Sequence, residues 1–137
     1  MPTQIRRVDY FYTSVAAEAG AAVDVLDQLA LLGVNLLAFA AVPTGPMRTQ
    51  LTMFPEDRTL FEAAARNAGI AIDGPYPALL AQGADRHGVV ASILGRLAAA
   101  GVEVYASSGM ASGASSYGYL VHVRPNDIDN AVAALDA

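Results

Sequence analysis

Asp85, Arg86 and His87 are consecutive, and together they place a carboxylate, a guanidinium and an imidazole in one short segment. Gly88 follows them and opens a run with apolar residues at helical spacing, at Val89, Val90, Ile93, Leu94 and Leu97. A carboxylate beside an imidazole could exchange protons with a substrate. The free backbone N–H groups at the start of a helix attract a carboxylate or a phosphate. The segment therefore allows two chemistries, acid–base catalysis and the binding of a small anion.

Catalysis has the weaker support. Asp85 and His87 are two residues apart in a turn, and that spacing alone does not orient an acid–base pair. The other histidine, His122, lies within a predicted strand, where a structural role is more common. Residues 109–113 miss the Gly-x-Ser-x-Gly pattern by one position and fall in a predicted hairpin loop. We therefore expect no enzyme activity, and an enzyme is the third-ranked alternative.

Composition excludes several other classes of protein. The net charge is −5, all eight basic residues are arginine, and no basic cluster exceeds Arg6–Arg7, which argues against binding to nucleic acid or to an anionic membrane. The chain has no cysteine, so disulfides and thiolate metal sites are excluded. Residues 29–42 are too short and interrupted to span a membrane, and the first residues do not resemble a signal peptide. We expect a cytoplasmic protein without a cofactor or metal.

The segment around Gly88 matches an earlier segment around Gly20. Equivalent residues of the two segments are 68 positions apart. From Asp57 to Asp127 the separation is 70, which places two extra residues in the second copy, most simply in the loop around Ser112. The pattern predicts an internal duplication. In the 68-residue register Gly20, Leu26, Leu29, Ala30, Gly33 and Val34 match Gly88, Leu94, Leu97, Ala98, Gly101 and Val102.

Periodicity predicts the same order of elements in both copies. The second strand, 34–42, is apolar on both faces, which favours a central position in a sheet. Residues 73–77 contain two prolines and are predicted to be a stiff linker, and no fourth strand is evident in the second copy. The predicted elements are strands 5–15, 34–42, 47–54 and 70–72 with helices 20–32 and 57–68, and then strands 78–81, 102–110 and 117–124 with helices 89–100 and 127–135.

This order predicts an α+β fold of two ferredoxin-like βαββα(β) repeats, 1–73 and 78–137, each an antiparallel sheet with both helices on one face. Each half alone would bury little surface. The composition is 54% hydrophobic, which is rich for a small monomer. We therefore expect the halves to share an interface, within the chain or in a homodimer. The strand missing from the second repeat would leave a sheet edge unpaired, and this edge could pair in the homodimer.

An α-amino acid needs a site for its carboxylate and an oxygen-rich partner for its ammonium group. The helix start at Gly88 could supply the first. Asp85, Asn35 or Glu103 could supply the second, because all three lie in loops or at strand starts. Asp85 is equally consistent with a simple turn or N-cap role.

These residues resemble an ACT domain. The resemblance is carried by Asp85–Val89, by Gly101–Val104 after the helix, by Tyr117–Val121, and in the first copy by Gly20 and Gly33–Leu37. The sequence departs from the family pattern where a proline is usual, at His87 and Ala19, and where an aspartate is usual, at Ala17.

The resemblance implies a regulatory domain that binds a small molecule, commonly an amino acid, between two ACT domains. Carried over by position, one site would combine Asn35 and Leu36 with Asp85, Arg86, His87, Gly88 and Val89. The opposite site, Ala17–Gly20 with Glu103, is degenerate. We therefore expect an amino-acid sensor that forms a homodimer and regulates a metabolic enzyme. The alternative is a ligandless dimerisation or interaction module.

Overall fold

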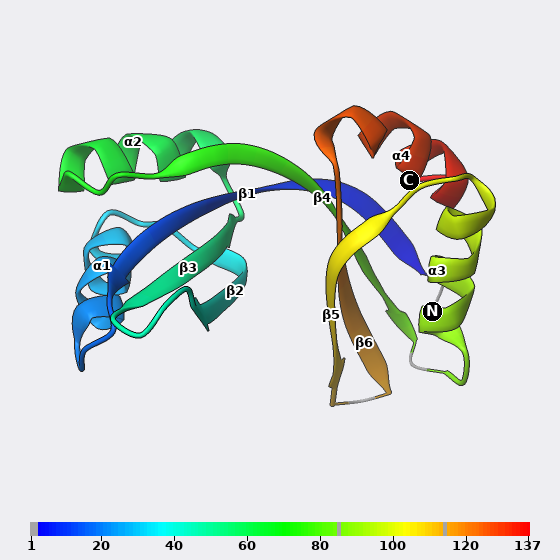
Figure 1. The fold of residues 1–137 in the computed structure, drawn as a ribbon, viewed down its shortest axis with the longest axis horizontal. Coiled ribbons are helices and arrows are strands. Elements are labelled where there is room, and N and C mark those ends of the chain that lie inside the picture. The colour runs from blue at the N-terminus through cyan, green and yellow to red at the C-terminus, as the bar shows by residue number, and fades with distance from the viewer. Residues whose placement is uncertain (1–2, 85, 114) are drawn as a thin grey trace. The chain divides into compact units, whose positions relative to one another are not determined.

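The structure is a computed structural model that describes residues 3–84, 86–113 and 115–137. It contains two compact units (Figure 1), the first formed by Asp9–Tyr76. The second is formed by Pro77–Ala137 together with the N-terminal residues up to Val8. The sequence analysis grouped those first residues with the first repeat instead. In the described part of the chain, no helix is both long and apolar enough to cross a membrane.

Both units have the βαββαβ order of the ferredoxin-like fold, so the predicted fold class is confirmed. The first unit uses β1 (Gln4–Ala16), α1 (Ala21–Leu31), β2 (Leu36–Pro43), β3 (Arg48–Pro55), α2 (Arg58–Ala68) and the beginning of β4 (Asp73–Ala84). The second uses the remainder of β4, α3 (Val89–Ala99), β5 (Val104–Ser112), β6 (Ser116–Val123), the 3-10 turn η1 (Pro125–Asp127), α4 (Ile128–Leu135) and the beginning of β1.

The strands follow the order β2-β3-β1-β4 in the first unit and β1-β4-β6-β5 in the second. The pairs β1–β3, β2–β3, β4–β6 and β5–β6 are antiparallel. The second repeat therefore has the fourth strand that the sequence analysis did not find, because β1 supplies it from the beginning of the chain. Ile5 of β1 packs against the core of that unit. The Tyr117 hydroxyl also donates a hydrogen bond to Thr3 Oγ1 at 3.3 Å.

Each unit has one core between its two helices and one face of its strands. In the first unit the core joins both helices to alternating residues of β1 and β3, as the strand period of two requires. Those buried residues are Phe11, Leu29, Leu51, Met53, Phe61 and Ala64. In the second unit α3 and α4 contribute Val89, Ile93, Leu97, Ile128, Ala131 and Leu135, which pack on β4 and β6. The prediction that both helices cover one face is confirmed.

The glycines of the repeat hold equivalent backbone positions. Gly20 (φ 88°) and Gly88 (φ 78°) are the N-cap residues of α1 and α3, in the left-handed region that glycine reaches without steric cost. Gly33 and Gly101 follow the helices with φ of 85° and 75°, and each donates its N–H to a helix carbonyl at 3.0 Å. The predicted internal repeat is therefore present in the backbone as well as in the sequence.

The predicted site of the two-residue insertion was wrong. Pro43 pairs with Thr49 in the first hairpin and Ala111 pairs with Tyr117 in the second, so the 68-residue separation holds through both hairpins. The extra residues come later, in η1, between β6 and α4. The separation of 70 was read from residues beyond β6, and the sequence alone did not show where between them it began.

Two further predictions need correction. β2 is an outer strand, not a central one, and most of its apolar residues are exposed. Residues 73–77 are the first part of the continuous strand β4, not a linker, whereas residues 70–72 are not a strand. Pro75 is tolerated because β4 is the outer strand of the first unit, where a missing N–H breaks no ladder.

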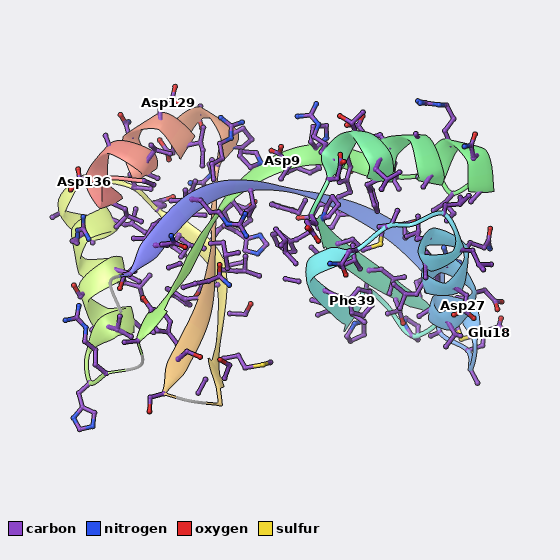
Figure 2. The ribbon with its side chains drawn as sticks, turned by 180° about the vertical axis from the view of Figure 1, so that it is seen from behind. Asp9, Glu18, Asp27, Phe39, Asp129 and Asp136 are labelled. Atoms are coloured by element: carbon purple, nitrogen blue, oxygen red, sulfur yellow. The ribbon has the colours of Figure 1, made fainter. Side chains whose placement is uncertain are left out.

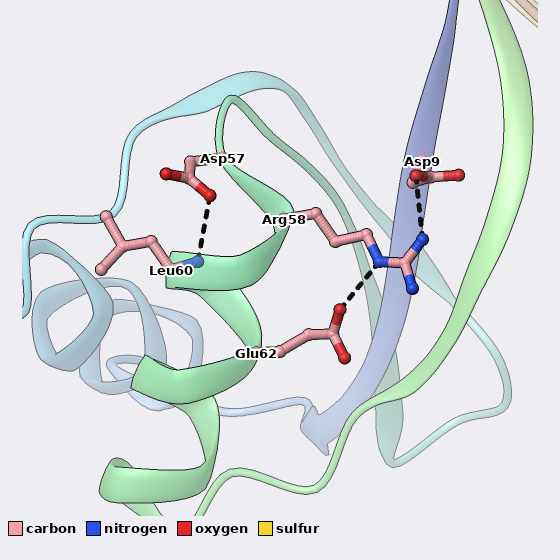
Figure 3. Close-up of polar contacts among 5 residues, drawn as sticks. All are labelled: Asp9, Asp57, Arg58, Leu60 and Glu62. Atoms are coloured by element: carbon pink, nitrogen blue, oxygen red, sulfur yellow. Dashed lines mark hydrogen bonds and ion pairs between the residues drawn. The ribbon is translucent and has the colours of Figure 1, made fainter.

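The second helix begins as the sequence predicts (Figure 3). Asp57 is its N-cap residue, and its Oδ1 accepts a hydrogen bond from the Leu60 N–H at 3.1 Å. Arg58 binds Glu62 at 2.8 Å and Asp9 at 3.4 Å. These ion pairs are solvent-exposed and contribute little, so the cap is the stronger contribution to this helix start.

We predict that Asp57→Ala lowers the free energy of unfolding by about 1 kcal/mol, because one N–H of the first turn loses its acceptor. Urea denaturation measures the change. Asp127→Ala is the matched control, since Asp127 precedes α4 but makes no side-chain cap bond. It should change stability by less than about 0.5 kcal/mol. Equal losses in the two variants would contradict the role of the cap.

Candidate functional site

The predicted loop of the second repeat lies at the start of α3. Arg86 and His87 are exposed, Gly88 is the N-cap residue, and Val89 is buried in the core. Asp85 lies outside the described residues. Because the N-cap residue is a glycine, it offers no side-chain acceptor to the first-turn N–H groups. The helix start thus keeps backbone N–H groups that could donate hydrogen bonds to a carboxylate.

The other predicted residues lie at the start of β2. Leu36 is half-buried and packs against the core of its unit, which fixes the backbone there. The exposed Asn35 donates from Nδ2 to Glu56 Oε2 at 2.5 Å, and its carbonyl accepts the Glu56 N–H at 2.9 Å. This pair orients the amide and presents oxygen atoms from both side chains. Such a group suits an ammonium ligand.

The second repeat has a counterpart to this pair with different charges. Glu103 and Arg124 lie 68 residues after Asn35 and Glu56. Arg124 donates a hydrogen bond to the carboxylate of Glu103 and forms an ion pair with it. The same hydrogen bond holds the pKa of Glu103 below its usual value. The carboxylate that could have bound an ammonium group in the degenerate site is therefore already engaged by a guanidinium.

The site residues thus fall into two groups. Asn35 and Leu36 belong to the unit Asp9–Tyr76, and Arg86–Val89 belong to the other unit. Sequence reasoning missed Glu56 and Arg124. Glu56 hydrogen-bonds to Asn35, and Arg124 hydrogen-bonds to Glu103. The 68-residue register could have identified them as equivalent positions, but their contacts depend on pairing between strands.

The structure describes two of the residues that raised the catalytic alternative, Ser112 and His122. Among the described residues, no group of three or more histidine, cysteine and acidic side chains could hold a metal ion. Ser112 lies in the β5–β6 hairpin and hydrogen-bonds to Ser116, so the near match to a nucleophile motif is a hairpin turn. His122 is in mid-strand, and burial lowers its pKa. Its ring lies 6.1 Å from that of Tyr105, in an edge-on arrangement.

No protein-family model matches the sequence, and no curated protein sequence matches it. Solved structures match nearly the whole chain. Protein BT0572 from Bacteroides thetaiotaomicron has a TM-score of 0.81 and 18% identity, over 96% of this chain and 88% of that one. The ligand-free regulatory subunit of aspartate kinase from Thermus thermophilus has a TM-score of 0.65 and 14% identity, over 99% and 95%.

An aspartate kinase from Clostridium acetobutylicum also matches, with a TM-score of 0.53 and 18% identity. The match covers 96% of this chain but 33% of that one. The structures with this fold therefore include separate regulatory subunits as well as a whole kinase. The chain has the tandem ACT-type fold that the sequence resemblance implied.

We predict that stability falls as the pH drops below about 6.5, because the unfolded chain protonates His122 while the half-buried imidazole of the folded chain resists protonation. His122→Gln should reduce this loss. Urea denaturation at about pH 7.5 and about pH 5.5 measures it. His87→Gln, a change at an exposed turn, is the control and should retain the loss. An unaltered pH dependence in His122→Gln would contradict the assignment.

Proposed function

We propose that this chain is a regulatory protein without catalytic activity that binds an α-amino acid. The Asn35–Glu56 pair carries the proposal, because it offers oxygen atoms where the equivalent Glu103–Arg124 pair is closed by a cation. The fold shared with regulatory subunits of aspartate kinase supports the regulatory role. A separate metabolic enzyme is the partner that this role requires.

In the proposed site, the carboxylate of the ligand accepts hydrogen bonds from backbone N–H groups near His87, Gly88 and Val89. Its ammonium group binds Asp85 or the side-chain oxygen of Asn35, which Glu56 holds in place. Arg86 and Leu36 complete the site.

We also propose that the chain forms a homodimer. The sequence analysis based this on a strand missing from the second repeat, but β1 supplies that strand. The homodimer proposal therefore rests on β2 instead. β2 is an outer strand, and its exposed side chains include Phe39 (42% exposed) and Val42 (44% exposed), with Phe39 labelled in Figure 2. An apolar outer strand with unpaired backbone groups is a template for pairing with another chain. The same surface would serve the alternative, a ligandless interaction module. The cytoplasmic location remains a prediction.

We predict that Asn35→Ala and Asp85→Ala each weaken amino-acid binding about ten- to a hundredfold, because a charged hydrogen bond contributes about 1.5–3 kcal/mol. A thermal-shift screen of the standard amino acids first identifies the ligand, and calorimetry then measures the affinities. Glu18→Ala is the control, since it lies in the degenerate loop of the first repeat. It should leave binding nearly unchanged.

Unchanged affinity in both variants would contradict the site. If Asp85 only supports the turn, Asp85→Ala should lower stability by about 1 kcal/mol and leave binding intact. The absence of any stabilising amino acid in the screen would favour the interaction module.

We predict that the wild-type chain sediments as a dimer at micromolar concentration and that Phe39→Glu converts it to a monomer, because the substitution places a charge on the pairing strand. Sedimentation velocity measures both. Leu31→Glu is the control: Leu31 is 86% exposed at the end of α1, away from the outer strand, and should leave the dimer intact. A wild-type monomer would contradict the proposal.

A further inference from the structure

A hollow of about 270 Å3 opens in the unit that contains Pro77–Ala137. One wall is a single stripe of α3, formed by Val89, Ser92, Ile93 and Arg96. These positions follow the spacing i, i+3, i+4 and i+7, so the helix turns one continuous face to the hollow. The other walls come from the beginning of β1 and the end of α4.

The floor of the hollow is aliphatic. Ile5 of β1 and Leu135 of α4 join Val89 and Ile93 of α3, and the last three are at most 6% exposed. They belong to the core of the unit or pack against it, so this surface is rigid. Of the four, only Ile5 keeps appreciable exposed surface, so the floor offers a small apolar contact to a short aliphatic chain.

Among the described lining residues, the rim carries a net positive charge. Arg86 and Arg96 are its cations and Asp136 is its acid; Asp136 lies at the end of α4 (Figure 2) and meets Arg96 at 3.7 Å. Within the described ranges, Arg86 makes no ion pair. Thr3 Oγ1 already accepts a hydrogen bond from Tyr117, which leaves the Thr3 O–H free to donate. Arg86 therefore supplies a guanidinium donor at the rim, and Thr3 supplies a hydroxyl donor.

The first repeat has no equivalent of this charge. At the positions 68 residues earlier, Glu18 stands for Arg86, Asp24 for Ser92 and Gln28 for Arg96. The backbone is repeated, but the cations and the hydroxyl are replaced by two acids and an amide. The positive rim is therefore a property of the second repeat and not of the fold.

We propose that the hollow binds a small aliphatic monocarboxylate. Its carboxylate meets the guanidinium of Arg86 or Arg96 and a hydroxyl donor, because planar guanidinium groups match carboxylates. Its alkyl chain lies on the aliphatic floor. Among the described lining residues, two guanidinium groups and one carboxylate leave one net positive charge, which matches the single negative charge of the ligand. An inorganic phosphate would leave the aliphatic floor unused. This site shares Arg86 and Val89 with the proposed amino-acid site, but it needs neither Asn35 nor Leu36, which distinguishes the two.

The test is a titration of the isotope-labelled full chain with 4-methylpentanoate, followed by NMR. We expect shifts concentrated at the amides of Thr3, Ser92 and Ile93. Arg86→Gln and Arg96→Gln are both measured, and the one that removes the guanidinium bound to the carboxylate should weaken binding about tenfold, through loss of a charged hydrogen bond or ion pair. Ser92→Leu, which fills the hollow from an exposed helix position, should abolish it. Arg66→Gln on α2 is the control and should bind like wild type.

Asp136→Asn tests whether a more positive rim strengthens binding of the carboxylate. It removes the acid that opposes Arg96, so binding should tighten, whereas a purely structural role for Asp136 would not improve it. Asn35→Ala should leave this titration unchanged, which separates it from the amino-acid site. The proposal is overturned if 4-methylpentanoate causes no shifts at these amides. It is also overturned if inorganic phosphate causes the same shifts with equal affinity, or if Arg86→Gln and Arg96→Gln both bind as tightly as wild type.

Discussion

The structure depends on two long strands, β1 and β4, each of which contributes residues to both units. β1 has 13 residues and β4 has 12, about twice the length of an ordinary strand. The boundary between the units crosses β1 after Val8 and β4 after Tyr76. The first unit is one continuous segment, whereas the second joins Pro77–Ala137 to the beginning of β1. The close approach of these strands is visible at Gly83, where an added Cβ would lie 2.9 Å from Thr3 Cα.

The sequence was sufficient for features that depend on local chemistry. The helices were predicted closely because glycines at Gly20, Gly33, Gly69, Gly88 and Gly101 take left-handed conformations at helix ends, and because Asp57 is a cap. The repeat order followed from the same positions. Features that depend on the placement of strands were predicted poorly. An apolar strand such as β2 is consistent with either a buried centre or an exposed edge, and only its neighbours decide between them.

The candidate site shows the same limit. The turn Arg86–Val89 and the strand start at Asn35 could be found from motifs in the chain. Glu56 and Arg124 could not, since each acts on a residue 21 positions earlier through pairing between strands. Because of them, the two repeats share a backbone but differ in charge at this position. At Glu18 and Arg86, and again at Glu56 and Arg124, equivalent positions carry opposite charges. Duplication preserved the scaffold while the electrostatics of the two copies separated.

The shared strand also sets an order of assembly during synthesis. Residues 4–8 leave the ribosome well before the part of β4 beside which they lie, which is made some seventy residues later. The beginning of β1 therefore cannot pair with this part of β4 until the segment Asp9–Tyr76 has been made. Contacts between such distant segments form slowly, because the intervening loop has to be closed first. We infer that the second unit is completed last, although the beginning of β1 belongs to it.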